Sequence, residues 1–150
     1  MLIHELSGGE CLEILQRTKL ARLACSRRDQ PYVVPVHFSY DLDGHCLYGF
    51  STVGQKIEWM RDNPKVCVEI EDIENKDWWA TVLAFGRYEE VGDAPEEAEV
   101  RKRVWELFQQ RSEWWLPATA KVGARERHNT VVYRVQIDRL TGRRSMRQRV

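Results

Sequence analysis

The chain has 150 residues, and its 23 Lys and Arg balance its 23 Asp and Glu, so its formal net charge at pH 7 is zero. This length is typical of one domain, and the hydrophobic and charged fractions of 43% and 31% exclude a disordered or low-complexity chain. A neutral chain lacks the excess of Lys and Arg that neutralises phosphates, so we expect no nucleic-acid partner. No apolar stretch reaches the roughly 18 residues of a membrane helix and no signal peptide is visible, so we expect a cytoplasmic protein without membrane contact.

Tryptophan is unusually frequent. Four of the six Trp form the pairs Trp78-Trp79 and Trp114-Trp115. Such broad, flat side chains fill a core, anchor an interface or stack on a planar ligand, and the sequence alone leaves these alternatives open. The four Cys are far apart in the chain and form no closely spaced pairs, so we predict buried thiols and no metal site.

The first half of the chain predicts a helix followed by a strand-rich segment. Ser7 and Glu10 have the spacing of a capping box, and the helix that they begin is expected to end near Arg17. Three segments of strand character follow, at residues 19–26, 32–40 and 45–51. In the second of these, Val34, Val36, Phe38 and Tyr40 share one face, whereas Val33, Pro35, His37 and Ser39 share the other. Residues 41–44 are typical of a hairpin turn between the last two strands.

The second half alternates helices and strands. A helix is expected over residues 52–63, with Thr52 as its N-cap, because Pro64 follows it. Further strands are expected around residues 66–71, 79–91 and 131–137, with Gly86 as a possible bulge. Pro95 is predicted at the first position of a helix that reaches about residue 111. Residues 112–129 show no clear period, and residues 141–150 are interpreted as a basic tail.

Together these elements predict a mainly β protein with a few helices. The six expected strands are mostly antiparallel neighbours, and strands of this kind close best as a small barrel with helices outside. We find no internal repeat and no linker, so we interpret residues 1–150 as one domain.

Polar residues gather where the strand at 45–51 leads into the next predicted helix. Ser51 and Thr52 offer hydroxyl groups, Gly54 allows close approach of a ligand to the backbone, and Lys56 adds a positive charge. Backbone amides in the first turn of a helix attract anions, so this segment is suited to a phosphate monoester. Ordinary capping is the alternative, and the spacing of a Walker loop is absent.

At this point the sequence resembles the pyridoxamine 5'-phosphate oxidase-like flavoproteins. The resemblance is carried by Pro31-Tyr32-Val33-Val34-Pro35-Val36-His37-Phe38, Asp43-Gly44, Tyr48, Ser51, Gly54, Lys56 and Asn63-Pro64-Lys65-Val66. It is extended by Trp78-Trp79-Ala80-Thr81-Val82 and Gly86-Arg87. It implies a six-stranded antiparallel FMN-binding split barrel, a homodimer with flavin at the subunit interface, and similarity to the nitroimidazole-resistance branch.

The resemblance also implies three groups of cofactor-binding residues. The group implied at the FMN phosphate is Ser51, Thr52 and Lys56. The group whose backbone is implied beside the isoalloxazine ring is Pro35, Val36 and His37, with Phe50 near the ribityl chain. The group implied at the ring or the dimer seam is Trp79, Thr81 and Val82, although a core or interface role fits Trp79 equally.

His37 is the candidate catalytic residue. In the nitroimidazole-resistance branch a His of this strand lies near the reactive edge of the flavin, and an imidazole with a pKa near ~6.5 suits proton transfer at neutral pH. A barrel histidine with satisfied hydrogen bonds is the alternative. The sequence departs from true pyridoxamine 5'-phosphate oxidases, which have an Arg where this chain has Val33-Val34 and a recognisable substrate segment at the C-terminus. Vitamin B6 oxidation is therefore not expected.

The sequence thus predicts an FMN-dependent oxidoreductase. It would transfer hydride or electrons through flavin N5 to or from a small molecule such as a nitro compound or a quinone, and it would act as a homodimer. Two alternatives stay open: a flavin-binding or sensing module without turnover, and a split barrel that binds haem or a deazaflavin.

Overall fold

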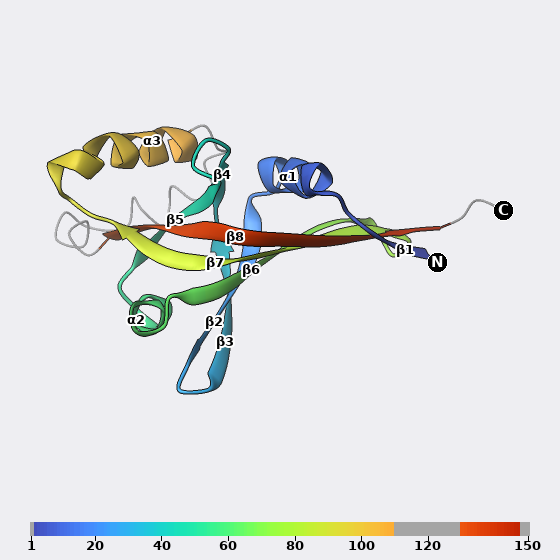
Figure 1. Ribbon diagram of the computed structural model, residues 1–150, viewed down its shortest axis with the longest axis horizontal. Helices are drawn as coiled ribbons and strands as arrows, with labels where there is room; N and C mark the ends of the chain where they lie inside the picture. The colour runs from blue at the N-terminus through green and yellow to red at the C-terminus, as the bar shows by residue number, and fades with distance from the viewer. Residues whose placement is uncertain (1, 110–129, 148–150) are drawn as a thin grey trace.

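The structure is a computed structural model that describes residues 2–109 and 130–147 (Figure 1). Its strands are β1 (Leu2–Glu5), β2 (Leu20–Arg27), β3 (Gln30–His37), β4 (Ser39–Asp41), β5 (Cys46–Thr52), β6 (Lys65–Asn75), β7 (Trp78–Val91) and β8 (Thr130–Met146). Its helices are α1 (Gly8–Arg17), α2 (Gln55–Asp62), the short 3-10 helix η1 (Pro95–Glu97) and α3 (Ala98–Gln109). The expectations for residues 110–129, including Trp114-Trp115, lie outside the described residues.

All strand pairs in these residues are antiparallel, and they form one sheet in the order β3-β2-β6-β7-β8-β5-β4, with β1 added beside β8. The two strands at the ends of this path, β3 and β4, are separated in the chain by Phe38 alone. The sheet therefore has to curl until its two ends approach each other, as in a split barrel. The predicted mainly β, antiparallel fold is confirmed.

The strand count differs from the prediction because one expected strand is divided and another was not foreseen. Residues 32–40 were expected as one strand, but β3 pairs with β2 whereas β4 pairs with β5. Phe38 lies between them, is buried, and donates its N–H to the carbonyl of Lys19 at 3.0 Å. With β1 added, the described residues hold eight strands in place of six.

Helix α1 begins where its local sequence predicts, whereas the start of α2 is set by the strand pairing of the residues before it. In α1 the capping box is confirmed: Ser7 Oγ accepts from the Glu10 N–H at 3.2 Å, and Glu10 Oε2 accepts from the Ser7 N–H at 2.8 Å. The predicted start of α2 is wrong, since its N-cap is Gly54 and not Thr52. Thr52 stays in β5, where it pairs with Thr130.

Strand β8 is much longer than the sequence indicates. It continues to Met146, so residues 141–146 of the expected basic tail are strand residues that pair with β7 and partly with β1. The predicted irregularity beside Gly86 is present, but the extra residue is Asp138 in β8, because Phe85 pairs with Arg139 and Gly86 pairs with Ile137. Strand β6 likewise extends to Asn75, which leaves only a short turn before β7.

The core lies inside the barrel, and a second apolar cluster lies beneath α3. The barrel core includes the fully buried Ile14, Ile57, Met60 and Val82. The second cluster contains Cys46, Tyr48, Val91, Val104, Phe108 and Val132. Figure 1 shows α3 along the side of β5 and β4, and α2 near the start of β6. No described helix is long and apolar enough to cross a membrane.

Candidate functional site

The candidate site is the break in the sheet between β3 and β5, which are in contact but do not pair with each other. The register of β4 on β5 pairs Ser39 with Tyr48, and if it continued past Phe38 it would place Val36 opposite Ser51. The chain instead turns β3 away to pair with β2, while β3 and β5 stay close enough to be in contact. The predicted ring-binding and phosphate-binding segments therefore lie on two sides of one opening, which we call the β3–β5 opening.

One side of the opening is the free edge of β3. Among the described strands, β3 is hydrogen-bonded to β2 only, so its other edge presents backbone groups without a strand partner. Pro35 has no N–H and is exposed, Val36 is nearly buried, and His37 is half-buried at the end of the strand. Because the Phe38 N–H bonds Lys19, the alternation of the ladder turns the backbone groups of Val36 toward β2 and leaves the Pro35 carbonyl on the outer edge.

The other side of the opening is the start of α2. Its N-cap, Gly54, supplies no side-chain hydrogen bond, so the amides of the first turn are not capped by that residue. Thr52 is exposed, and a Cβ at Gly54 would meet open space. Lys56 lies in this first turn and is half-buried, and this burial lowers the pKa of its ammonium group. The arrangement is suited to an anion.

Two of the residues predicted to bind the flavin already make contacts with other parts of the protein. Ser51 Oγ donates to the Thr52 carbonyl at 2.8 Å, so that it would have to rotate to donate to an anion. Phe50 packs against α3, with its ring centroid 4.7 Å from those of both Trp105 and Phe108. Its side chain therefore belongs to the cluster beneath α3 and fixes this helix beside the opening.

The third predicted group lies at the far end of β8. Ser51 pairs with Val131 and Trp79 pairs with Ser145, so the two sites are separated by fourteen positions along one strand. At about 3.3 Å a residue this is on the order of 45 Å, far longer than a flavin mononucleotide. Val82 is also fully buried in the core. Within one chain, Trp79, Thr81 and Val82 therefore lie far from the phosphate side of the β3–β5 opening, at Ser51.

His37 borders a separate hollow of about 570 Å³, together with Lys19, Leu20 and Glu71. Arg17 and Asp72 form an ion pair at the side of this hollow. The same two residues line a second hollow, of about 240 Å³, which contains Trp78 and Trp79. Sequence reasoning missed Arg17 and Asp72, because no local motif links the end of a helix to a strand 55 residues later.

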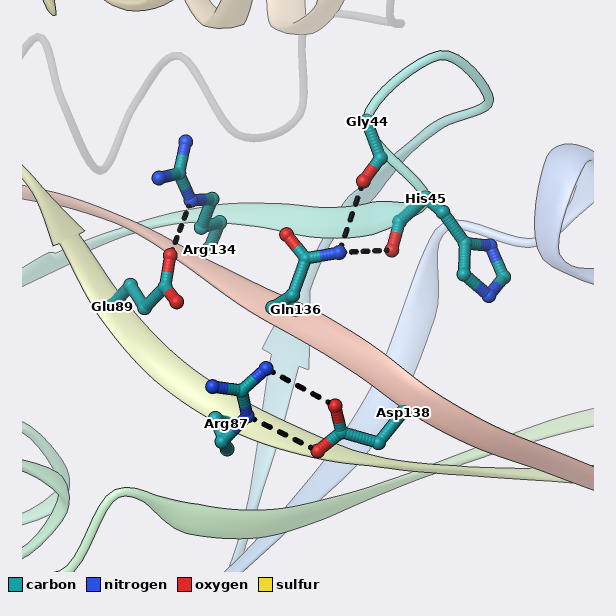
Figure 2. Close-up of polar contacts among 7 residues, drawn as sticks. All are labelled: Gly44, His45, Arg87, Glu89, Arg134, Gln136 and Asp138. Carbon is teal, nitrogen blue, oxygen red and sulfur yellow. Dashed lines mark hydrogen bonds and ion pairs between the residues drawn. The ribbon is translucent and has the colours of Figure 1, made fainter.

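A row of polar contacts crosses the outer surface of β7 and β8 (Figure 2). Arg87 donates to both carboxylate oxygens of Asp138 at 3.2 Å, and Arg134 donates to Glu89 at 2.8 Å. The amide of Gln136 donates to the carbonyls of Gly44 and His45 at 3.1 and 3.2 Å. These bonds hold the β4–β5 hairpin and the bulge in place, which gives them a structural role.

Burial governs the titration of the core groups. It raises the pKa of Tyr48 to about 12, and it also raises the pKa values of the buried Cys11, Cys25 and Cys46 and of Cys67, which is only half-buried, unlike the buried thiol predicted. Thiols with raised pKa values are protonated at neutral pH and are poor nucleophiles. In residues 2–109 and 130–147, no group of three His, Cys, Asp or Glu side chains is placed to hold a metal ion.

Comparison with known proteins shows the family of the chain. The family model described as pyridoxamine 5'-phosphate oxidase matches residues 7–144. The chain belongs to this family. An uncharacterized protein of Rhizobium meliloti (strain 1021) is 36% identical over 146 residues, which cover 95% of both chains.

Solved structures of family-like proteins share the fold. A protein of Mesorhizobium loti described as FAD-binding is 36% identical, has a TM-score of 0.82, and matches over 97% of this chain and 99% of its own. A protein of Mycobacterium smegmatis, also described as FAD-binding, has 20% identity and a TM-score of 0.67 over 94% and 98% of the two chains. The second likeness is one of fold alone. The resemblance recognised in the sequence is thus confirmed.

Proposed function

We propose that this protein binds a flavin in the β3–β5 opening and acts as an FMN-dependent oxidoreductase on a small molecule. The observation that carries the proposal is the opening itself. It combines a helix start that has no side-chain cap and carries Lys56 with a strand edge that pairs with no other described strand. Family membership and a relative described as FAD-binding support the binding of a flavin.

The residues of the opening have distinct proposed roles. Lys56, Thr52 and a rotated Ser51 would hold the phosphate together with the first amides of α2. The backbone at Pro35, Val36 and His37 would bind the polar edge of the ring. When bound, the flavin supplies hydride or electron transfer at its N5, with the protein providing orientation. His37 would hold a proton for the substrate, such as a nitro compound or a quinone, because imidazole titrates near neutral pH.

We further propose a homodimer. The phosphate group at Ser51 and Thr52 and the group at Trp79 and Thr81 pair with opposite ends of β8. A two-fold pair with β8 strands running in opposite directions would bring Trp79 and Thr81 of one copy toward the opening of the other. The outer face of the sheet supports this arrangement, because Val33 is 61% exposed and Leu83 and Phe85 are half-exposed there.

The four cysteines form no disulfide, which suits the reducing cytoplasm.

The test is a titration of the purified, flavin-free protein with riboflavin, FMN and FAD, followed by flavin fluorescence. We expect FMN to bind, with one flavin per chain and a dimeric mass in solution. Absence of binding for all three flavins would refute the proposal, and a strong preference for FAD would replace FMN as the cofactor. Reduction of the bound flavin by NADH or NADPH, and its reoxidation by a nitro compound or a quinone, would separate an enzyme from a flavin-binding module.

A further inference from the structure

The second hollow, at the far end of β8, has the features of a ligand site that the flavin proposal does not use. We call it the tryptophan hollow and define it by Trp78, Trp79, Arg17, Arg144, Ser145 and Glu74. We propose that it binds a planar aromatic carboxylate. The binding itself needs no flavin, whereas its role as the substrate site rests on the proposed function.

The size and the walls of the hollow suit one aromatic ring. Its volume is about 240 Å³, and a cavity of about 150 Å³ is enough to hold benzene. A ring with one or two small substituents therefore fits. Trp78 is 40% exposed and Trp79 is half-buried. An indole that is already partly exposed gains contact area when a flat ring covers it, and offset stacking adds to that gain.

Two arginines and two carboxylates line the hollow, so their charges cancel, and Arg144 is the group that can meet an anionic substituent. Arg17 is neutralised by its ion pair with Asp72. Arg144, by contrast, approaches Glu10 at 3.7 Å, which is an ion-pair contact but too long for a hydrogen bond. The planar fork of a guanidinium matches a carboxylate with two parallel hydrogen bonds. Glu74 is exposed to solvent, which screens its repulsion of an anion.

A buried hydroxyl in the wall gives a second, independent indication. Ser145 is fully buried, lines the hollow, and pairs directly opposite Trp79 in the sheet. Its Oγ has no hydrogen-bond partner within the described part of the chain. A buried hydroxyl without a hydrogen bond costs free energy. If the Trp79 indole moves aside, a ligand oxygen can accept a hydrogen bond from the Ser145 hydroxyl and relieve this cost.

The hollow also adjoins the hollow beside His37. Arg17 and Asp72 line both, so their ion pair is the wall between the two spaces. In the proposed dimer this end of the chain meets the β3–β5 opening of a second copy. An aromatic carboxylate bound here would then lie beside the flavin ring, which makes this ligand class the proposed substrate class.

The experiment is isothermal titration calorimetry with 4-nitrobenzoate and with nitrobenzene, on the flavin-free and the flavin-loaded protein. Arg144→Gln should weaken 4-nitrobenzoate by about tenfold or more and leave nitrobenzene unchanged, because only the first ligand carries the charge. Trp79→Ala and the milder Trp78→Ala should weaken both ligands. Ser145→Ala should weaken 4-nitrobenzoate without lowering the stability of the protein.

Two controls keep the result specific. Arg143→Gln removes a positive charge from the neighbouring position of β8, outside the hollow, and Trp105→Phe alters an exposed indole on α3. Both should leave the affinity for 4-nitrobenzoate unchanged. Equal losses in Arg143→Gln and Arg144→Gln would overturn the proposal, as would the absence of binding to both forms of the wild-type protein. Failure of the flavin titration alone would refute the proposed function and leave this calorimetric result standing.

Discussion

Gly86 is the position where a single methyl group should do the most damage to the barrel. A Cβ at this residue would lie 2.1 Å from the carbonyl oxygen of Gln136 and 3.0 Å from Val135 Cγ1. Contacts below 3.0 Å do not occur for real Cβ atoms, so β7 and β8 would have to move apart by nearly 1 Å in Gly86→Ala. Because β7 is also paired with β6 at Val66, it is not free to move.

The expected cost follows from this displacement. Ladder hydrogen bonds lengthened from about 2.9 to about 3.9 Å are effectively lost. We estimate two such bonds at about 1 kcal/mol each and about 1–3 kcal/mol for overpacking. Gly86→Ala should therefore lower the free energy of unfolding by about 3–5 kcal/mol, a large share of the 5–15 kcal/mol of a typical domain.

Urea denaturation followed by tryptophan fluorescence measures this change as a lower midpoint. Gly9→Ala is the matched control, since a Cβ there meets nothing within 4 Å and α1 should gain up to about 1 kcal/mol in helix propensity. The side-chain amide of Gln136 donates to the carbonyls of Gly44 and His45 (Figure 2). A shift of Gln136 in Gly86→Ala should therefore also loosen the β4–β5 hairpin, so that its backbone amide protons exchange faster. A Gly86→Ala variant within about 0.5 kcal/mol of the wild type would refute the reasoning.

Three further predictions concern named charges. Lys56→Ala should weaken FMN by about tenfold or more and leave riboflavin unchanged in a fluorescence titration, because only FMN carries the phosphate; equal losses would exclude the assigned role. Arg103→Leu removes the cation that bonds Asp41, whose side chain is 6% exposed, and should cost about 1–3 kcal/mol in urea denaturation; an unchanged midpoint would contradict this. The hydrogen bond from Arg61 lowers the pKa of Glu90, so this pair stabilises the fold above the unfolded pKa near ~4.3, and its contribution is lost as the pH falls through the folded pKa. The stability difference between the wild type and Glu90→Gln should thus shrink on acidification below about pH 4, and a difference that does not vary with pH would count against it.

Some of the candidate site was predictable because its signals are local. Residue types and spacing alone predict an anion site at Ser51, Thr52, Gly54 and Lys56, and in the structure these residues lie together at the end of β5 and the start of α2. The sequence does not show which strands are hydrogen-bonded to each other. Thr52 has the side chain of an N-cap, but its pairing with Thr130 keeps it in β5 and moves the start of α2 to Gln55.

The sequence by itself determined the periodic elements. The Ser7–Glu10 capping box, the alternation along β6 and the hairpin turn before β5 depend on residues only a few positions apart, so they can be predicted without the rest of the chain. The tertiary structure alone decided the break at Phe38, since β3 and β4 choose partners from distant parts of the chain. It also decided the length of β8, whose arginine-rich end is polar enough to be interpreted as a tail. That end is held in the sheet by backbone hydrogen bonds to β7 and β1, which do not depend on side-chain polarity.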